Sequence, residues 1–106
     1  MARYLIQASY TAEGARGLLK DGGSKRRAVV VKLAESLGGR MEAFYFTFGE
    51  TDAIAIIEVP DNVSAAAASL VVAASGAASS KTVVLLTPEE IDQAVHKSAN
   101  YVPPGR

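Results

Sequence analysis

Four short stretches of the chain predict β-strands: two alternate in character from one residue to the next, and two are short, mainly apolar runs. In the first stretch, Tyr4, Ile6 and Ala8 lie on one side, while Leu5 and Gln7 lie on the other. Both sides are half apolar, so the pattern leaves open which of them faces a core. The expected strands are residues 3–10, 40–48, 53–59 and 81–86.

The second and third strands are the most apolar. Residues 53–59 are apolar on both sides as far as Glu58, which is typical of a central strand. In the second strand we expect an aromatic side to face the helices and a mixed side to face away from them. The aromatic side consists of Glu42, Phe44, Phe46 and Phe48, and the mixed side consists of Met41, Ala43, Tyr45 and Thr47. Residues 49–52 between these strands form a turn of hairpin length.

Helical spacing of apolar residues predicts helices between and after the strands. The clearest start signal is a capping box of Thr87 and Glu90, with Pro88 at the first helical position. The other expected N-terminal caps are Thr11, Ser24 and the Pro60-Asp61-Asn62 segment. The expected helices are residues 12–20, 25–37, 63–75 and 88–98.

Without the last helix, the order of the elements is strand, helix, strand, strand, helix, strand. This order predicts an α+β fold of the ferredoxin-like βαββαβ type, with a four-stranded antiparallel sheet and both helices on one face. Residues 1–98 are expected to form a single domain, and residues 99–106 a C-terminal tail. The uncovered face of the sheet is too apolar for water, so we expect a second copy of the chain to cover it.

Composition argues against several classes of function. The 106 residues include 11 Lys and Arg, 11 Asp and Glu, one His and no Cys. The balanced charge argues against nucleic-acid binding. The absence of Cys, together with the presence of a single His, argues against common metal sites. The basic run Lys25-Arg26-Arg27 starts a helix, which indicates an anionic neighbour from another subunit. No apolar run is long enough for a membrane span or a signal peptide, so we expect a cytoplasmic protein.

The segment from Phe44 to Asp52, followed by an apolar strand, resembles the GYD family of small bacterial proteins. The resemblance extends over residues 2–96. Thr51 stands where the family signature has a tyrosine, whereas Gly49 and Asp52 match the signature. The resemblance implies the dimeric α+β barrel superfamily, in which two ferredoxin-like subunits join their sheets around a pocket.

Candidate ligand-binding residues lie where such a pocket would be: Gln7, Ser9, Tyr45, Thr47 and Asp52. With the opposite phase of the first strand, Tyr4 and Tyr10 would replace Gln7 and Ser9. Asp52 is interpreted either as a general base or binding carboxylate, or as a turn carboxylate that accepts backbone hydrogen bonds. His96 is a second catalytic candidate, and the alternative is an exposed pair with Asp92 one turn earlier.

We therefore expect a homo-oligomer, at least a dimer, that binds a small organic ligand between the sheets of paired subunits without a metal or cofactor. Two alternatives stay open: a cofactor-independent oxygenase or isomerase acting on a small aromatic or lactone, and a purely structural assembly. The superfamily contains both enzymes and binding modules, so the fold alone does not choose between them. Neither a nucleic acid nor a membrane is an expected partner.

Overall fold

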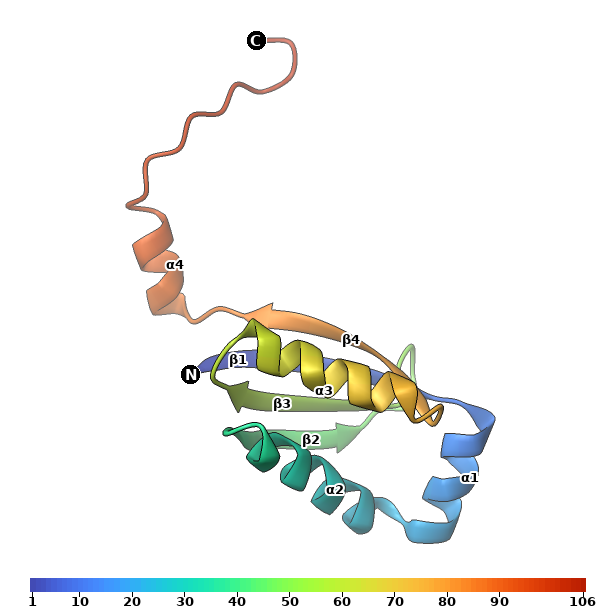
Figure 1. Cartoon of the computed structure of the whole chain (residues 1–106). Coiled ribbons are helices and arrows are strands. Elements are labelled where there is room, and N and C mark those ends of the chain that lie inside the picture. Colours follow the sequence, from blue (N-terminus) through green and yellow to red (C-terminus); the bar gives the residue numbers. More distant parts are fainter.

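The computed structural model describes residues 1–106 and has the predicted α+β architecture. The four strands form one antiparallel sheet in the order β2-β3-β1-β4, and α2 and α3 lie on the same side of it (Figure 1). This arrangement confirms the ferredoxin-like prediction. The elements are β1 (Ala2–Tyr10), α1 (Ala12–Asp21), α2 (Gly23–Ser36), β2 (Arg40–Phe46), β3 (Ala53–Val59), α3 (Asn62–Ala74), β4 (Ala78–Leu85) and α4 (Pro88–Ala94).

The core lies between the sheet and the two helices, on what we call the covered face. Every second residue of β3 is buried there, and Tyr4 of β1 is also buried, with its hydroxyl donating to Asn62 of α3. Tyr4 thus settles the phase of the first strand, since the side that carries Leu5 and Gln7 faces away from the helices. Six of the nine buried residues are alanines, so the core is thin and contains few large side chains.

A β-bulge in β2 makes part of the predicted facing wrong. The pairing with β3 shifts between Met41 and Ala43, and the extra residue reverses the alternation at that point. Met41 therefore packs against the core, whereas Glu42 lies on the uncovered side and binds Arg3. Phe44 and Phe46 face the helices as predicted.

The second strand is also shorter than predicted. It ends at Phe46, and Phe48 follows in a turn with a positive φ of 50°. The Phe48 ring is 65% exposed and stacks on the ring of Phe46 at 5.8 Å. The expectation that Phe48 continues the strand's aromatic side is therefore wrong.

The helix starts follow the polar residues of the sequence at three of four places. Thr11, Asp61 and Thr87 cap α1, α3 and α4, and the predicted capping box at Thr87 is complete. Ser24 does not cap α2, because that helix already begins at Gly23 after the positive-φ residue Gly22. None of the helices combines the length and the hydropathy that crossing a membrane requires.

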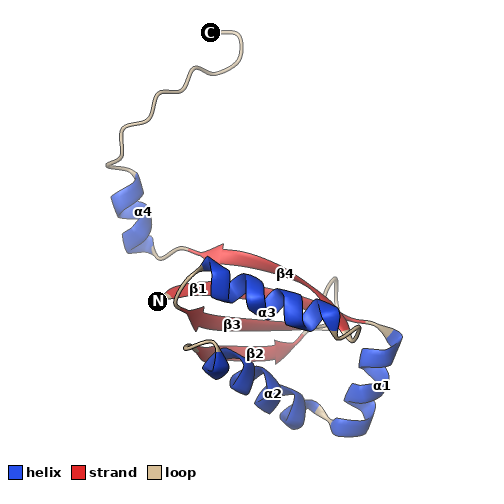
Figure 2. Ribbon diagram, viewed as in Figure 1, coloured by secondary structure: helices blue, strands red, loops and turns tan.

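The chain beyond β4 stands apart from the rest of the molecule. We call residues 86–106 the C-terminal arm. Helix α4 and the extended tail after it project away from the sheet and its covering helices (Figure 2). The helix ends at Ala94, four residues before the predicted end at Ser98.

Candidate functional site

One face of the sheet carries no helix, and we call it the open face. Alternation and strand register place fifteen residues on it: Arg3, Leu5, Gln7 and Ser9 of β1, Arg40, Glu42, Ala43 and Tyr45 of β2, Ile54, Ile56 and Glu58 of β3, and Ser79, Lys81, Val83 and Leu85 of β4. These residues divide into a charged end, an apolar band and a polar end. The division matters because each zone suits a different kind of contact.

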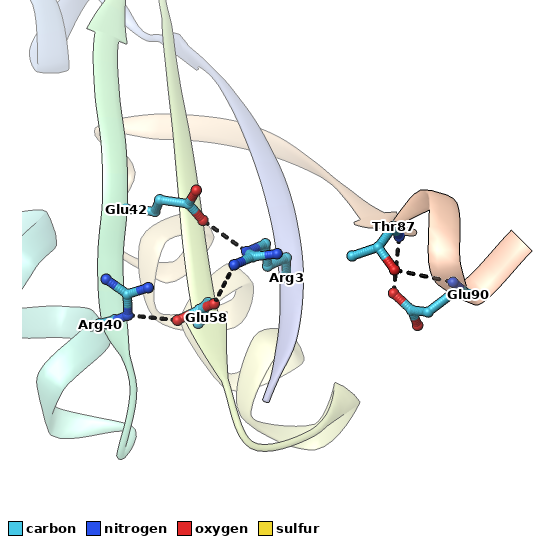
Figure 3. Close-up of polar contacts among 6 residues, drawn as sticks. All are labelled: Arg3, Arg40, Glu42, Glu58, Thr87 and Glu90. Carbon is cyan, nitrogen blue, oxygen red and sulfur yellow. Dashed lines mark hydrogen bonds and ion pairs between the residues drawn. The ribbon is translucent and has the colours of Figure 1, made fainter.

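The charged end is a network of two arginines and two glutamates (Figure 3). Arg3 binds Glu42 at 2.9 Å and Glu58 at 3.1 Å, and Arg40 binds the other oxygen of Glu58 at 2.6 Å. The hydrogen bond from Arg40, together with the charges of Arg40 and Arg3, lowers the pKa of Glu58. Since the four charges satisfy one another, this end presents no net charge.

The apolar band crosses the middle of the open face. Leu5 pairs with Ile56 on one side and with Val83 on the other, so the three side chains are neighbours across adjacent strands. Tyr45 lies opposite Ile54 and is 66% exposed. Helices α2 and α3 lie on the other side of the sheet (Figure 1), so neither covers this band.

The polar end holds a hollow of about 230 Å³ that contains no hydrophobic residue. Gln7 and Ser9, which the sequence predicted, lie in it together. The structure adds Lys81 opposite Gln7, and Glu50 from the turn between β2 and β3. The full lining is Gln7, Ser9, Glu50, Thr51, Ser79, Ser80 and Lys81.

Asp52 lies in the turn beside this end of the sheet and links that turn to the backbone of β1. Its carboxylate accepts a hydrogen bond from the Tyr10 N–H at 2.8 Å, and its own N–H donates to the carbonyl of Ala8. Thr47 closes the same turn, since its hydroxyl donates to the carbonyl of Thr51. These contacts match the turn interpretation of Asp52 and do not bring Asp52 and Thr47 into the hollow.

His96 is far from the candidate residues on the sheet. It is exposed, lies just beyond α4 and forms no ion pair with Asp92, so the expected His96–Asp92 pair is absent. The β1–β4 register puts the start of the arm beside Arg3, whereas Asp52 lies beside Ala8 near the other end of β1. The two catalytic candidates therefore do not converge. No cluster of three or more His, Asp or Glu residues could hold a metal ion.

A second cavity, about 50 Å³ and mostly apolar, lies under α2 and α3 on the covered face. Arg26 and Tyr10 border it, with the guanidinium 5.8 Å from the centre of the Tyr10 ring. The Nε of Arg26 is buried without a hydrogen-bond partner. The sequence singled out Arg26 only within a basic run, and Lys25 of that run pairs with Asp21 of the same chain at 3.4 Å.

The fold and the open face define a ferredoxin-like α+β domain whose sheet is covered on one side only. A family model described as GYD domain matches residues 4–95, and the chain belongs to the GYD domain family. No curated protein and no solved structure matches the chain. Thr51 borders the polar hollow.

Proposed function

We propose that the protein is a homodimeric small-molecule-binding protein in which the open faces of two copies pack together. The apolar band carries the proposal. Leu5, Ile56 and Val83 form a continuous apolar strip, in which Leu5 and Ile56 are half-buried and Val83 is 46% exposed. Each Å² of apolar area that a partner covers is worth about 25 cal/mol. A second copy of the chain supplies an equally apolar and equally regular partner surface.

The charged end suits a self-complementary interface. A two-fold axis brings the same patch of both copies together, so a patch with net charge would repel itself. Arg3, Arg40, Glu42 and Glu58 balance within one chain and leave no such repulsion. The charged end can therefore meet its own copy without burying an unpaired charge.

The polar hollow is the proposed ligand site of each subunit. Lys81 supplies a cation, and Gln7 and Ser9 supply an amide and a hydroxyl within a space of about 230 Å³. None of the chain's ion pairs involves Lys81, so its ammonium group is available to an anionic group. A second copy over the apolar band would screen the hollow from water. The ligand class that fits is a small organic acid.

Native mass spectrometry of the protein as isolated tests the assembly and the ligand together. We expect a dimer that retains a small molecule, and we expect Lys81→Gln to lose that molecule while staying dimeric. Lys97→Gln, a neutralisation in the C-terminal arm, is the matched control. Loss of the ligand from Arg26→Gln but not from Lys81→Gln would place the ligand in the cavity under α2 and α3 and would contradict the polar hollow.

The alternative functions give different results in the same hollow. A cofactor-independent oxygenase or isomerase needs a proton-transferring group beside its substrate, and Glu50 is the carboxylate that lines the hollow. In that case Glu50→Gln would keep the bound molecule and lose its turnover. A purely structural assembly would give a dimer without any retained molecule. Two carboxyl groups have displaced pKa values. Ion pairing lowers the pKa of Glu58 and helix capping lowers the pKa of Asp61, whereas a carboxyl group that donates a proton needs a raised pKa.

A further inference from the structure

The C-terminal arm contains a helix, α4, that packs on no other element of the chain. Residues 88–102 are all exposed, and α4 stands clear of the sheet and of α3 (Figure 1). Its start is strongly specified: the Thr87 hydroxyl accepts from the N–H of Glu90, and the Glu90 carboxylate accepts from the N–H of Thr87 (Figure 3). A seven-residue helix is nevertheless too short to persist alone in water. The helix therefore needs a surface to pack against.

The arm offers an apolar side for such a contact. Ile91 lies in α4 and Val95 is the residue that caps its C-terminal end; they are one helical turn apart, lie on the same side, and are both exposed. Glu89 and Glu90 point to other sides of the helix, where a docked arm would leave them in water. Tyr101 and Val102 continue the exposed apolar residues into the tail.

A matching surface lies between α3 and β4. A groove of about 220 Å³ there is lined by Tyr4, Ala65, Ala66 and Val84 and by three polar residues, Asn62, Ser69 and Thr82. The polar side chains are hydrogen-bonded within the chain, Asn62 to Tyr4 and Ser69 to Thr82. On the neighbouring surface of α3, Val63 and Leu70 are exposed, and the chain has no charged residue from 62 to 80. Alanines at the base of a groove allow a helix to approach closely. We call this surface the α3–β4 groove.

The arm does not reach the groove of its own chain. Only Leu86 and Thr87 separate β4 from α4, Thr87 is extended at φ −76° and ψ 159°, and the following Pro88 fixes the direction of the helix start. The arm consequently points away from its own groove. Every copy has one arm and one groove. Two copies can therefore each place their arm in the groove of the other, which gives a closed dimer with no arm or groove left over.

We propose that the C-terminal arm exchanges between two copies of the chain, with Ile91 and Val95 of one copy docked in the α3–β4 groove of the other. Strand β4 is an edge of the sheet, so the arm and the groove both lie at its rim. A copy packed on the open face would be within reach around that rim. The proposal goes beyond the ligand site and does not depend on it.

Disulfide trapping tests the exchange, because the chain has no cysteine of its own. Ala66→Cys places a thiol in the groove, and Val95→Cys places one on the apolar side of the arm. Mixing the two single variants under mild oxidation is expected to give a covalent heterodimer. The control is Gln93→Cys, on the opposite side of α4, which should link to Ala66→Cys at least about tenfold more slowly, since a disulfide needs Cβ atoms in close apposition.

The doubly substituted chain separates the outcomes. A linked dimer in dilute solution supports exchange between copies. A link that forms within one chain would overturn the proposal, because the arm would then fold back on its own groove. Absence of any faster link for Val95→Cys than for Gln93→Cys would also overturn it. The thiol pair reports on the arm alone, so its failure is distinguishable from a failure of the open-face dimer, which the mass of open-face variants reports.

Discussion

Ile56 and Ile57 are consecutive residues of β3 with opposite surroundings. Ile57 is 2% exposed under the helices, whereas Ile56 lies in the apolar band of the open face, which neither α2 nor α3 covers. The same strand thus presents apolar side chains to a core and to a face without helices, where Ile56 is half-buried. The chain's own helices therefore cover only one of the two faces on which its sheet carries apolar side chains.

The covered face itself is modestly filled. Most of its buried side chains are alanines, and only Tyr4, Ile57 and Val59 are large and fully buried. Alanine removes little apolar area from water, so the covered face provides limited hydrophobic stabilisation. Covering the open face with a second copy would add the aliphatic burial that a chain of this size lacks.

The largest expected difference between the two faces comes from truncating the two isoleucines. Ile57→Ala should destabilise the fold by about 2–5 kcal/mol at any protein concentration, because it leaves a cavity in the core. Ile56→Ala should cost the single chain about 1 kcal/mol or less and weaken dimerisation instead. Urea unfolding at several protein concentrations measures both effects. If both variants lost the same stability, and neither loss depended on protein concentration, the proposed difference between the two faces would be wrong.

The next largest effect on stability comes from the close approach of the turn after α2 to the sheet. Gly39 lies in the turn after α2, and a Cβ there would be 1.8 Å from the carbonyl oxygen of Glu58. Gly39→Ala should therefore destabilise the protein by about 1–3 kcal/mol, since backbone must move. Gly17→Ala is the control, because nothing lies near that position in α1, and it should stabilise by up to about 1 kcal/mol. Thermal unfolding of the two variants should move in opposite directions.

Asp52→Ala probes the turn at the polar end of the sheet. The substitution leaves the Tyr10 N–H without its acceptor, which should cost about 1–2 kcal/mol of stability. If the carboxylate acts only in the turn, the ligand affinity of the folded variant stays unchanged. Glu50→Ala in the same turn is the matched control, and it should leave the stability unchanged. A loss of affinity without a loss of stability in Asp52→Ala would contradict the turn role.

The smallest expected effect is the pH dependence of the charged end. Arg40 and Arg3 lower the pKa of Glu58 below its ordinary value of 4.5 in the folded state. A carboxyl group whose pKa is lower in the folded state stabilises the protein when the pH is above the group's ordinary pKa. This stabilisation is lost as the pH falls through the pKa of the folded state. The difference in unfolding midpoint between the wild type and Glu58→Gln should therefore shrink below about pH 4.5. If this difference in unfolding midpoint stayed constant at acidic pH, the ion pairs of Glu58 with Arg3 and Arg40 would not be its cause. Asp61, whose pKa the Ser64 N–H and hydroxyl lower, should keep some acid sensitivity in both proteins.

Much of the fold could be predicted from local signals. The strands follow from alternation, and the caps Thr11, Asp61 and Thr87 follow from residues whose side chains accept nearby backbone N–H groups. Met41 and Glu42 were assigned to the wrong faces because a bulge is set by the pairing of two strands, and composition carries no signal for it.

The candidate site was only partly predictable for a similar reason. Gln7 and Ser9 are recognisable as polar residues on one side of one strand. Lys81 joins them through the β1–β4 register, which links residues more than 70 positions apart. The cavity beside Arg26 is lined by residues of β1, α2, β2, β3, α3 and β4, so it too depends on packing between distant elements.

The mass of the full chain in solution tests the central claim most directly. Sedimentation equilibrium at micromolar concentration should give twice the chain mass for the wild type and the single mass for Ile56→Asp, with circular dichroism showing that the variant stays folded. Leu19→Asp, at an 86% exposed apolar position of α1, is the matched control and should stay dimeric. A monomeric wild type, or an Ile56→Asp variant as dimeric as the control, would contradict the burial of the open face by a second copy.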